Sequence, residues 1–166
     1  MSMEGNSETP RESINLWRIT KQKHASNAFS GEGPRRFGAR WNHRGTAVVY
    51  ASDSLALAAL ELFVHLGRQG LQIRFVYFRI HVPADVSISS MDPKSLPADW
   101  RKKPPPTSTM DIGTHWADSN ESAVLGVPSA IVPVGMNYLL NPNHPQYAKI
   151  EISSPEPFTL DPRMWK

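Results

Sequence analysis

The sequence predicts a single domain of mixed class, α/β or α+β, in which short strands dominate the second half. The chain has 166 residues, the length of one domain. Thirteen of its 15 prolines lie at or after Pro83, and a proline inside a helix costs about 3 kcal/mol. Only residues 55–66 are rich enough in leucine and alanine to predict a good helix. Helix bundles and coiled coils are therefore poor candidates.

Each element follows from its local composition. Residues 1–13 are polar and are expected to form a disordered lead-in to a domain that spans residues 14–166. Residues 14–19 and 46–51 are rich in β-branched and aromatic residues and predict two strands. Between them, residues 29–42 are expected to form a long glycine-containing loop, and loops of this length are commonly functional or disordered.

The helix over residues 55–66 has N-cap side chains in residues 52–54, and Gly67 is its expected stop. Residues 71–82 predict a long strand whose apolar phase shifts at residues 75–76. Either a β-bulge or a strand covered on both faces explains this shift. The elements expected behind it are extended pieces over residues 86–89, 130–134 and 147–152, and a short helix over about 111–119.

Composition and charge exclude several classes of protein. Cysteine is absent, which excludes a disulfide scaffold, a thiolate nucleophile and a thiolate zinc site. The six histidines lack the spacing of metal ligands, so no metal is expected. A net charge of +3 does not require a nucleic-acid partner and suits a small anionic ligand equally well. Residues 1–13 hold no secretory signal, and glycine and proline interrupt the apolar run 123–140, so we expect a cytoplasmic protein with no membrane partner.

Glu61 is the most informative single residue. It is the only formally charged residue between Asp53 and Arg68, on a helix that is apolar nearly all round. A buried carboxylate is costly unless it has partners. Two interpretations are open. Glu61 could be a structural carboxylate that pairs with an arginine or lies on a solvated stripe of the helix. It could instead act in a cleft as a general base, a metal ligand or a stabiliser of a cation.

The loop of residues 29–42 could bind an anion. Arg40 offers a planar fork for a phosphate, and Gly31 and Gly33 would let backbone N–H groups approach the same group. The alternative is a flexible surface loop that tucks Trp41 into the core. The charged pairs Arg35-Arg36 and Lys102-Lys103 are interpreted as solvated.

Polar side chains near strand ends are further candidates. Tyr50 ends a buried strand, where it could stack on a ligand or simply fill the core. Ser129 opens an apolar stretch and could orient a ligand, or be an ordinary strand-edge serine; Ser122 and Asn137 are further candidates. No G-x-S-x-G elbow is present, so a serine nucleophile is not expected.

The chain resembles the RES-domain family, the toxins of Xre–RES toxin–antitoxin modules. The stretches that carry the resemblance occur in the family's order and together span roughly residues 14–158; they are residues 16–19, 38–42, 49–52, 58–61, 127–133, 137–142 and 144–145. The resemblance implies an α+β fold similar to ADP-ribosyltransferases: a compact single domain of short strands around a central cleft, with few helices.

The resemblance also implies site residues. The arginine, glutamate and serine after which the family is named fall on Arg40, Glu61 and Ser129, with Ser122 as a competing serine. The family's tyrosine and early arginine fall on Tyr50 and Arg18. Ala39 stands where the family has a second glycine, which puts any need for a positive φ there in doubt.

The activity implied is the consumption of NAD⁺ at its nicotinamide–ribose bond, by hydrolysis, phosphorolysis or ADP-ribosyl transfer. Glu61 would stabilise positive charge on the ribose. Arg40, Arg18 and the Gly31–Gly33 loop would hold the pyrophosphate, Tyr50 would face the nicotinamide, and Ser129 would orient the ribose or Arg40. Asn137 completes the expected NAD⁺-binding set.

The partner implied is a cognate antitoxin with a DNA-binding helix-turn-helix, whose C-terminal part blocks the cleft in an oligomeric complex. Two other functions stay open. The pI of about 9.3 and the Arg35-Arg36 pair suit an RNA-directed toxin, although no RNA motif is recognisable. A non-catalytic nucleotide-binding module would keep the scaffold without turnover.

Overall fold

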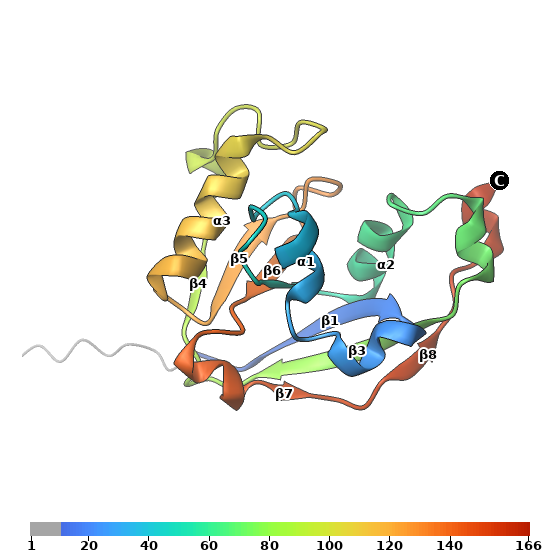
Figure 1. Ribbon diagram of the computed structural model, residues 1–166, viewed down its shortest axis with the longest axis horizontal. Helices are drawn as coiled ribbons and strands as arrows, with labels where there is room; N and C mark the ends of the chain where they lie inside the picture. Colours follow the sequence, from blue (N-terminus) through green and yellow to red (C-terminus); the bar gives the residue numbers. More distant parts are fainter. Residues whose placement is uncertain (1–10) are drawn as a thin grey trace, which may run out of the picture.

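The computed structural model, which describes residues 11–166, is a compact α+β domain built on one curled sheet (Figure 1). The strand order is β4-β5-β6-β2-β1-β3-β7, and β8 also pairs with β3. Only β4 and β5 run parallel. The predicted α+β class is therefore confirmed. The strands are β1 (Ile14–Lys21), β2 (Val49–Ser52), β3 (Phe75–Val82), β4 (Ile88–Ser90), β5 (Val124–Pro128), β6 (Met136–Leu140), β7 (Glu151–Ile152) and β8 (Glu156–Phe158).

The longest ladder joins β1 and β3. They pair over their whole length, from Ile14 opposite Val82 to Lys21 opposite Phe75. The register is continuous, so the β-bulge, one of the two explanations offered for the phase shift, is wrong. The apparent change of phase arises because Arg68–Gln72 form a 3-10 turn and the strand begins only at Phe75.

The sheet opens between β1 and β2. These strands meet at a single register position, Trp17 opposite Ser52. On its other edge, β2 pairs with β6 along its full length, from Val49–Leu140 to Ser52–Asn137. The two parts of the sheet therefore diverge, and α2 (Leu55–Phe63) follows directly from the end of β2 at this opening (Figure 1).

The rear apolar run forms a hairpin. β5 is buried at every position and pairs with β6, and residues 129–135 make the turn between them. The strand predicted over residues 130–134 is therefore wrong. Backbone hydrogen bonds from Ser129 to Gly135 and from Gly135 to Val132 close the turn, which leaves Val134 exposed.

The polar segment of residues 29–42 is not wholly a loop. It contains the short helix α1 (Glu32–Phe37), which begins after Gly31 at a φ of +72°. Pro34 is tolerated because it lies in the first turn, where backbone N–H groups have no helical partner. Glu32 binds the Arg35 guanidinium within the same helix.

The other two helices flank the sheet. Ser54 caps α2 by accepting a hydrogen bond from the Leu57 backbone, as predicted, but the helix ends at Phe63, before Gly67. The third helix, α3 (Thr107–Ser119), begins four residues before its predicted start. It covers one face of the β5–β6 hairpin through Trp116, which packs in a core cluster with Trp41, Val48, Ala117, Leu125, Val127 and Leu139.

Most of the predicted disordered lead-in, residues 1–10, lies outside the described residues. Arg11 lies against the body of the domain and donates hydrogen bonds to the carbonyl oxygens of Pro83 and Ala84. Within residues 11–166, every helix is too short or too polar to span a bilayer.

The packing of α3 yields a stability prediction. A Cβ atom at Gly113 would overlap the Trp41 carbonyl oxygen, so the helix and the segment that carries Arg40 and Trp41 touch backbone to backbone. We expect Gly113→Ala to lower the free energy of unfolding by about 3 kcal/mol or more, measured by urea unfolding. Gly33→Ala is the matched control because nothing lies within 4 Å of its added Cβ, and it should be neutral or stabilising. Equal stabilities of the two variants would contradict this packing.

Candidate active site in the cleft

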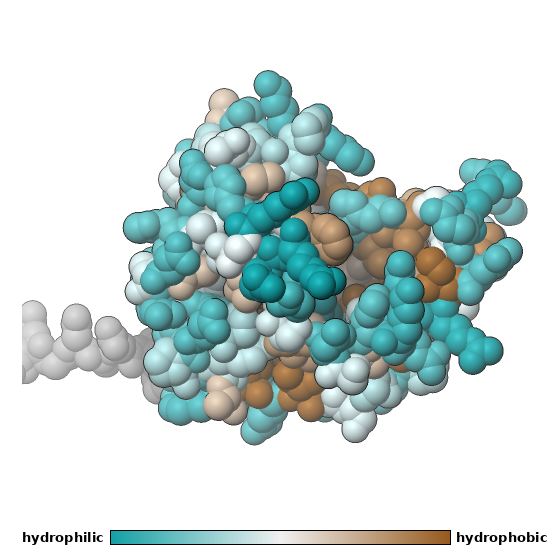
Figure 2. Space-filling model, viewed as in Figure 1, coloured by the Kyte–Doolittle hydropathy of each residue, from teal (hydrophilic) through white to brown (hydrophobic). Residues whose placement is uncertain are grey.

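A cavity of about 730 Å³ lies at the opening between β1 and β2. Both strands line it, together with α2, residues 38–41, the loop of residues 101–105, and Ala130 and Ile131 of the 129–135 turn. In the space-filling view, apolar surface gathers in the hollow on this side of the molecule (Figure 2). The volume is in the range of small-molecule sites, roughly 300–1,000 Å³.

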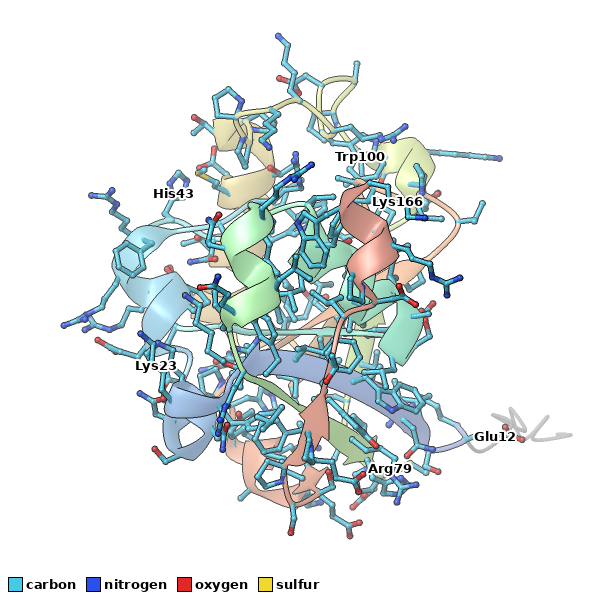
Figure 3. The ribbon with its side chains drawn as sticks, turned by 90° about the vertical axis from the view of Figure 1, so that its right-hand side faces the viewer. Glu12, Lys23, His43, Arg79, Trp100 and Lys166 are labelled. Atoms are coloured by element: carbon cyan, nitrogen blue, oxygen red, sulfur yellow. The ribbon has the colours of Figure 1, made fainter. Side chains whose placement is uncertain are left out.

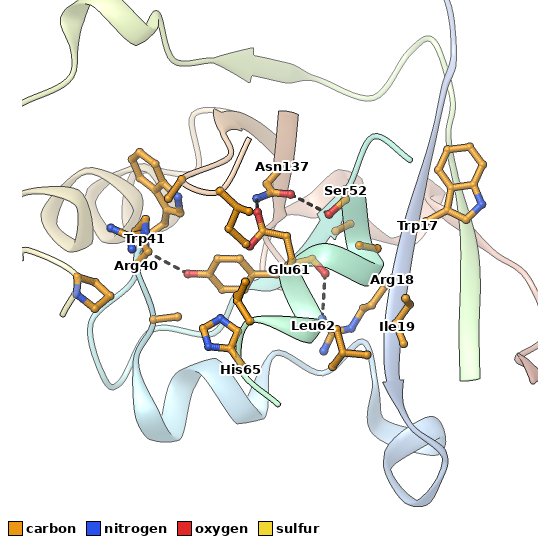
Figure 4. Close-up of a pocket in the computed structure, with 18 of the residues that line it drawn as sticks. Trp17, Arg18, Ile19, Arg40, Trp41, Ser52, Glu61, Leu62, His65 and Asn137 are labelled. Carbon is orange, nitrogen blue, oxygen red and sulfur yellow. Dashed lines mark hydrogen bonds between the residues drawn. The ribbon is translucent and has the colours of Figure 1, made fainter. Parts of the chain in front are cut away.

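Glu61 points from α2 into this cavity and lies beside Asn137 (Figure 4). Its Oε1 accepts hydrogen bonds from Ser129 Oγ at 2.7 Å and from Asn137 Nδ2 at 2.6 Å. Ser52 Oγ in turn donates to Asn137 Oδ1 at 2.7 Å. No hydrogen bond from residues 11–166 reaches Oε2, so the second oxygen remains available to a ligand. The carboxylate is not paired with an arginine in the described part of the chain, which disfavours the structural ion pair considered above.

The two candidate serines have different surroundings. Ser129 is buried beside Glu61, and its Oγ also accepts hydrogen bonds from the Ile131 and Val132 backbones. Ser122 Oγ accepts from Trp116 Nε1 and donates to the Val124 carbonyl, away from the residues that line the cavity. Of the two serines, Ser129 alone contacts Glu61.

Arg40 is fixed against the loop opposite α2. Its Nη1 donates to the carbonyl oxygens of Trp100 at 2.7 Å and Lys102 at 2.9 Å. Burial lowers the pKa of Arg40, whereas the nearby Glu61 carboxylate raises it. Next to Arg40, the indole rings of Trp41 and Trp100 pack with their centroids 6.4 Å apart. Trp100 lies in the upper half of the view in Figure 3, as does His43. The guanidinium is thus held at the cavity wall by backbone carbonyls.

Tyr50 is locked by Asn42, a residue that the structure buries completely. The Tyr50 hydroxyl donates to Asn42 Oδ1 at 2.7 Å and accepts from the Trp41 backbone at 3.2 Å. The Asn42 amide nitrogen donates to the carbonyls of Pro34, His43 and Thr46. Burial raises the pKa of the Tyr50 hydroxyl, which keeps it protonated and able to donate.

Arg18 places a second guanidinium at the cavity. Its Nε donates to the Ala28 carbonyl and its Nη1 to the Tyr50 carbonyl, each at 2.9 Å. Burial lowers the pKa of Arg18 to about 10, so the side chain stays charged at neutral pH. No carboxylate among the described residues forms an ion pair with it. In the view of Figure 4, Glu61 lies between Arg18 and Arg40.

The structure therefore brings most of the candidate residues together. Arg18, Arg40, Tyr50, Glu61 and Asn137 line the cavity, and Ser129 adjoins it through Glu61. Gly31 and Gly33 do not line it. Their predicted segment contributes Gly38 and Ala39 instead.

Sequence reasoning missed several residues of the site. Ser52 and Asn42 lie inside stretches that carry the family resemblance, so the resemblance was the signal that could have identified them. Arg101 and Lys103 also line the cavity, although Lys103 was interpreted above as a solvated loop charge. Nothing local in the sequence distinguishes Lys103 from its neighbour Lys102, which is not part of the cavity wall.

Comparison with known proteins is consistent across sequence and structure. The RES domain family matches residues 15–161. "Toxin Res" of Yersinia enterocolitica is 39% identical over 151 residues, covering 90% of this chain and 98% of that protein. "Prs ADP-ribosylating toxin" of a Sphingobium species is 39% identical over 153 residues, with 90% and 95% covered. A chain of the M. tuberculosis MbcT–MbcA toxin–antitoxin complex superimposes with a TM-score of 0.70 at 21% identity, covering 93% of this chain and 88% of that one, which shows a shared fold.

The contact between Tyr50 and Asn42 yields a second stability prediction. Tyr50→Phe removes the partner of the buried Asn42 Oδ1 and of the Trp41 N–H, and we expect a loss of about 1–3 kcal/mol of unfolding free energy. Chemical denaturation of the purified variant measures this loss. Tyr138→Phe is the control, because the Tyr138 hydroxyl forms no hydrogen bond with residues 11–166, and its effect should stay within about 0.5 kcal/mol. An unchanged Tyr50→Phe variant would mean that the hydroxyl does not hold the segment.

Proposed function

This chain belongs to the RES-domain family, and on that premise we propose that it is a toxin-type enzyme that cleaves the nicotinamide–ribose bond of NAD⁺. The observation that carries the proposal is that the two oxygens of the Glu61 carboxylate have different surroundings. One oxygen is fixed by Ser129 and Asn137, and the other is left to a cavity that Arg18 and Arg40 also line. NAD⁺ enters here as a substrate, and the proposed chemistry uses no metal.

The reaction requires a group that stabilises positive charge. When the bond between the ribose C1 and the nicotinamide nitrogen breaks, its electron pair leaves with nicotinamide and the ribose becomes oxocarbenium-like. A carboxylate oxygen aimed at this carbon lowers the barrier because it interacts more strongly with the developing cation than with the ground state. We assign this role to Glu61 Oε2.

The cations and Tyr50 would bind the remainder of the substrate. Arg18 and Arg40 would each bind the pyrophosphate, since both guanidinium groups keep donors that backbone carbonyls do not use. The Tyr50 ring, fixed through its hydroxyl, offers a flat surface to the nicotinamide. Asn137 and Ser129 act on the ribose through the position that they impose on Glu61.

The acceptor of the ADP-ribosyl group is water, phosphate or a protein side chain. The name of the Sphingobium relative, an ADP-ribosylating toxin, supports transfer of the ADP-ribosyl group. We further propose a cognate helix-turn-helix antitoxin that covers the cleft in an oligomeric complex, which the toxin–antitoxin assembly of the structural neighbour supports. NAD⁺ and a DNA-binding antitoxin are both available in the cytoplasm, so the protein would act there.

Glu61→Gln tests the central role. Glutamine keeps an oxygen that can accept from Ser129 and Asn137 and replaces the charged second oxygen with a neutral NH₂ group, so the stability should stay within about 0.5 kcal/mol of the wild type. Nicotinamide release from NAD⁺, measured with and without phosphate, should fall about 100- to 1,000-fold. Full activity in the variant would rule out this role. A wild-type protein that binds NAD⁺ without releasing nicotinamide would be a non-catalytic nucleotide-binding module.

Ser129→Ala and Ser122→Ala separate a serine that positions Glu61 from one that supports the core. Ser129→Ala removes a donor to Glu61 Oε1, so kcat should fall about tenfold or more while the KM for NAD⁺ changes little. Ser122→Ala should cost about 1–3 kcal/mol of unfolding free energy, since Trp116 Nε1 loses its acceptor, and should leave kcat unchanged in the folded protein. Ser129→Thr, which keeps the hydroxyl, should recover part of the lost kcat. The opposite pattern would assign the functional serine to Ser122.

A further inference from the structure

The loop of residues 97–106 brings two additional cations to the cavity. Arg101 and Lys103 both line it, and the loop that carries them is anchored because Arg40 binds the Trp100 and Lys102 carbonyls. Arg101 Nε also donates to the Ala130 carbonyl at 2.9 Å, which ties this loop to the 129–135 turn. The position of Arg101 is therefore defined even though its side chain is exposed.

The cavity wall carries more positive charge than the pyrophosphate needs. Arg18, Arg40, Arg101 and Lys103 line it, against the single carboxylate of Glu61. Neither Arg101 nor Lys103 forms an ion pair with any acidic residue in the described part of the chain. Arg101 is also close enough to Arg40 to lower its pKa, which is the effect of two like charges held together. A bound anion would offset this repulsion.

We propose that Arg101 and Lys103 form a phosphate subsite next to the pyrophosphate site. The inference rests on the proposed function, in which Arg18 and Arg40 match the two negative charges of the pyrophosphate. Arg101 and Lys103 then supply two further positive charges, and a terminal phosphate carries about −1.5 to −2 at pH 7. Exposure to solvent at the mouth of the cavity suits a group that enters or leaves with the substrate.

Two sources of phosphate have this chemistry. The first is a phosphate on the adenosine ribose of the dinucleotide, as in NADP⁺. The second is free inorganic phosphate that acts as the acceptor: its oxygen bonds to the ribose C1 as the C–N bond breaks, and nicotinamide takes the electron pair. In both cases the pair recognises one phosphate group that is not part of the pyrophosphate.

The test compares Arg101→Ala/Lys103→Ala with Lys102→Ala. The control removes a cation from the same loop that does not line the cavity, and it keeps the backbone carbonyl that binds Arg40. Binding of NAD⁺, NADP⁺ and inorganic phosphate is measured by calorimetry in the Glu61→Gln background, so that ligand is not consumed. Nicotinamide release is measured with Glu61 present, over a phosphate titration.

If the ligand is a ribose phosphate, we expect the double variant to weaken NADP⁺ binding about tenfold or more and NAD⁺ binding by less than about threefold. If the ligand is free phosphate, we expect the double variant to lose both phosphate binding and the stimulation of nicotinamide release by phosphate. NADP⁺ binding should then be unaffected. Either result supports the subsite.

The subsite is overturned if no ligand responds more than in Lys102→Ala. It is also overturned if NAD⁺ and NADP⁺ weaken equally without any effect on phosphate, because the cations would then serve the pyrophosphate. Failure of the proposed function is a separate outcome. In that case the wild type releases no nicotinamide, whatever the binding measurements show.

Discussion

The separation of β1 from β2 is the constraint on which the rest of the structure depends. Neighbouring strands normally satisfy each other's backbone groups, and an unpaired buried carbonyl costs about as much as a lost hydrogen bond. Here the strands meet only at Trp17 and Ser52, and beyond that point the Arg18 side chain donates to the Tyr50 carbonyl. The Arg18 guanidinium thus supplies a hydrogen bond of the kind that backbone pairing between strands normally provides. The gap that it spans is the cavity, which Arg18 also lines.

Glu61, like Arg18, makes structural hydrogen bonds and keeps a polar atom that they do not use. A carboxylate on an apolar helix must be solvated or bonded, and Ser129 and Asn137 satisfy only one of its oxygens. The supporting groups are Ser129, which is fully buried at the start of the 129–135 turn, and Asn137 on β6, a strand that pairs with β2 on one side and β5 on the other. These two hydrogen bonds orient the carboxylate, so in the proposed reaction the unbonded oxygen would need little reorganisation when charge develops in front of it. Stability and chemistry therefore use different atoms of one side chain.

Local sequence signals predicted the parts of the site that lie on regular elements. The β1 strand, the Ser54 cap and the helix that carries Glu61 follow from composition over a few residues, and they were found close to their observed positions. The 129–135 turn was misassigned because an apolar run with two prolines looks the same in a strand and in a tight turn. Arg101 was missed for another reason. Its place at the cavity depends on the loop that Arg40 binds, and Arg40 lies sixty-one residues away in the sequence, a separation that no periodicity encodes.

Arg40 and Glu61 differ in what their substitution can reveal. Arg40 binds two carbonyls of a loop that contains Pro97, Pro104, Pro105 and Pro106, and prolines cannot donate hydrogen bonds to one another's carbonyls. The guanidinium therefore holds the loop together, and its loss would displace Arg101 and Lys103 as well as remove a ligand contact. An inactive Arg40 variant would leave open which of these effects was responsible. Glu61 lacks this ambiguity, since its structural bonds end on an oxygen that glutamine retains. Glutamine replaces the other, charged oxygen with a neutral NH₂ group, so a loss of activity in a stably folded variant separates the proposed catalytic role of Glu61 from its role in the fold.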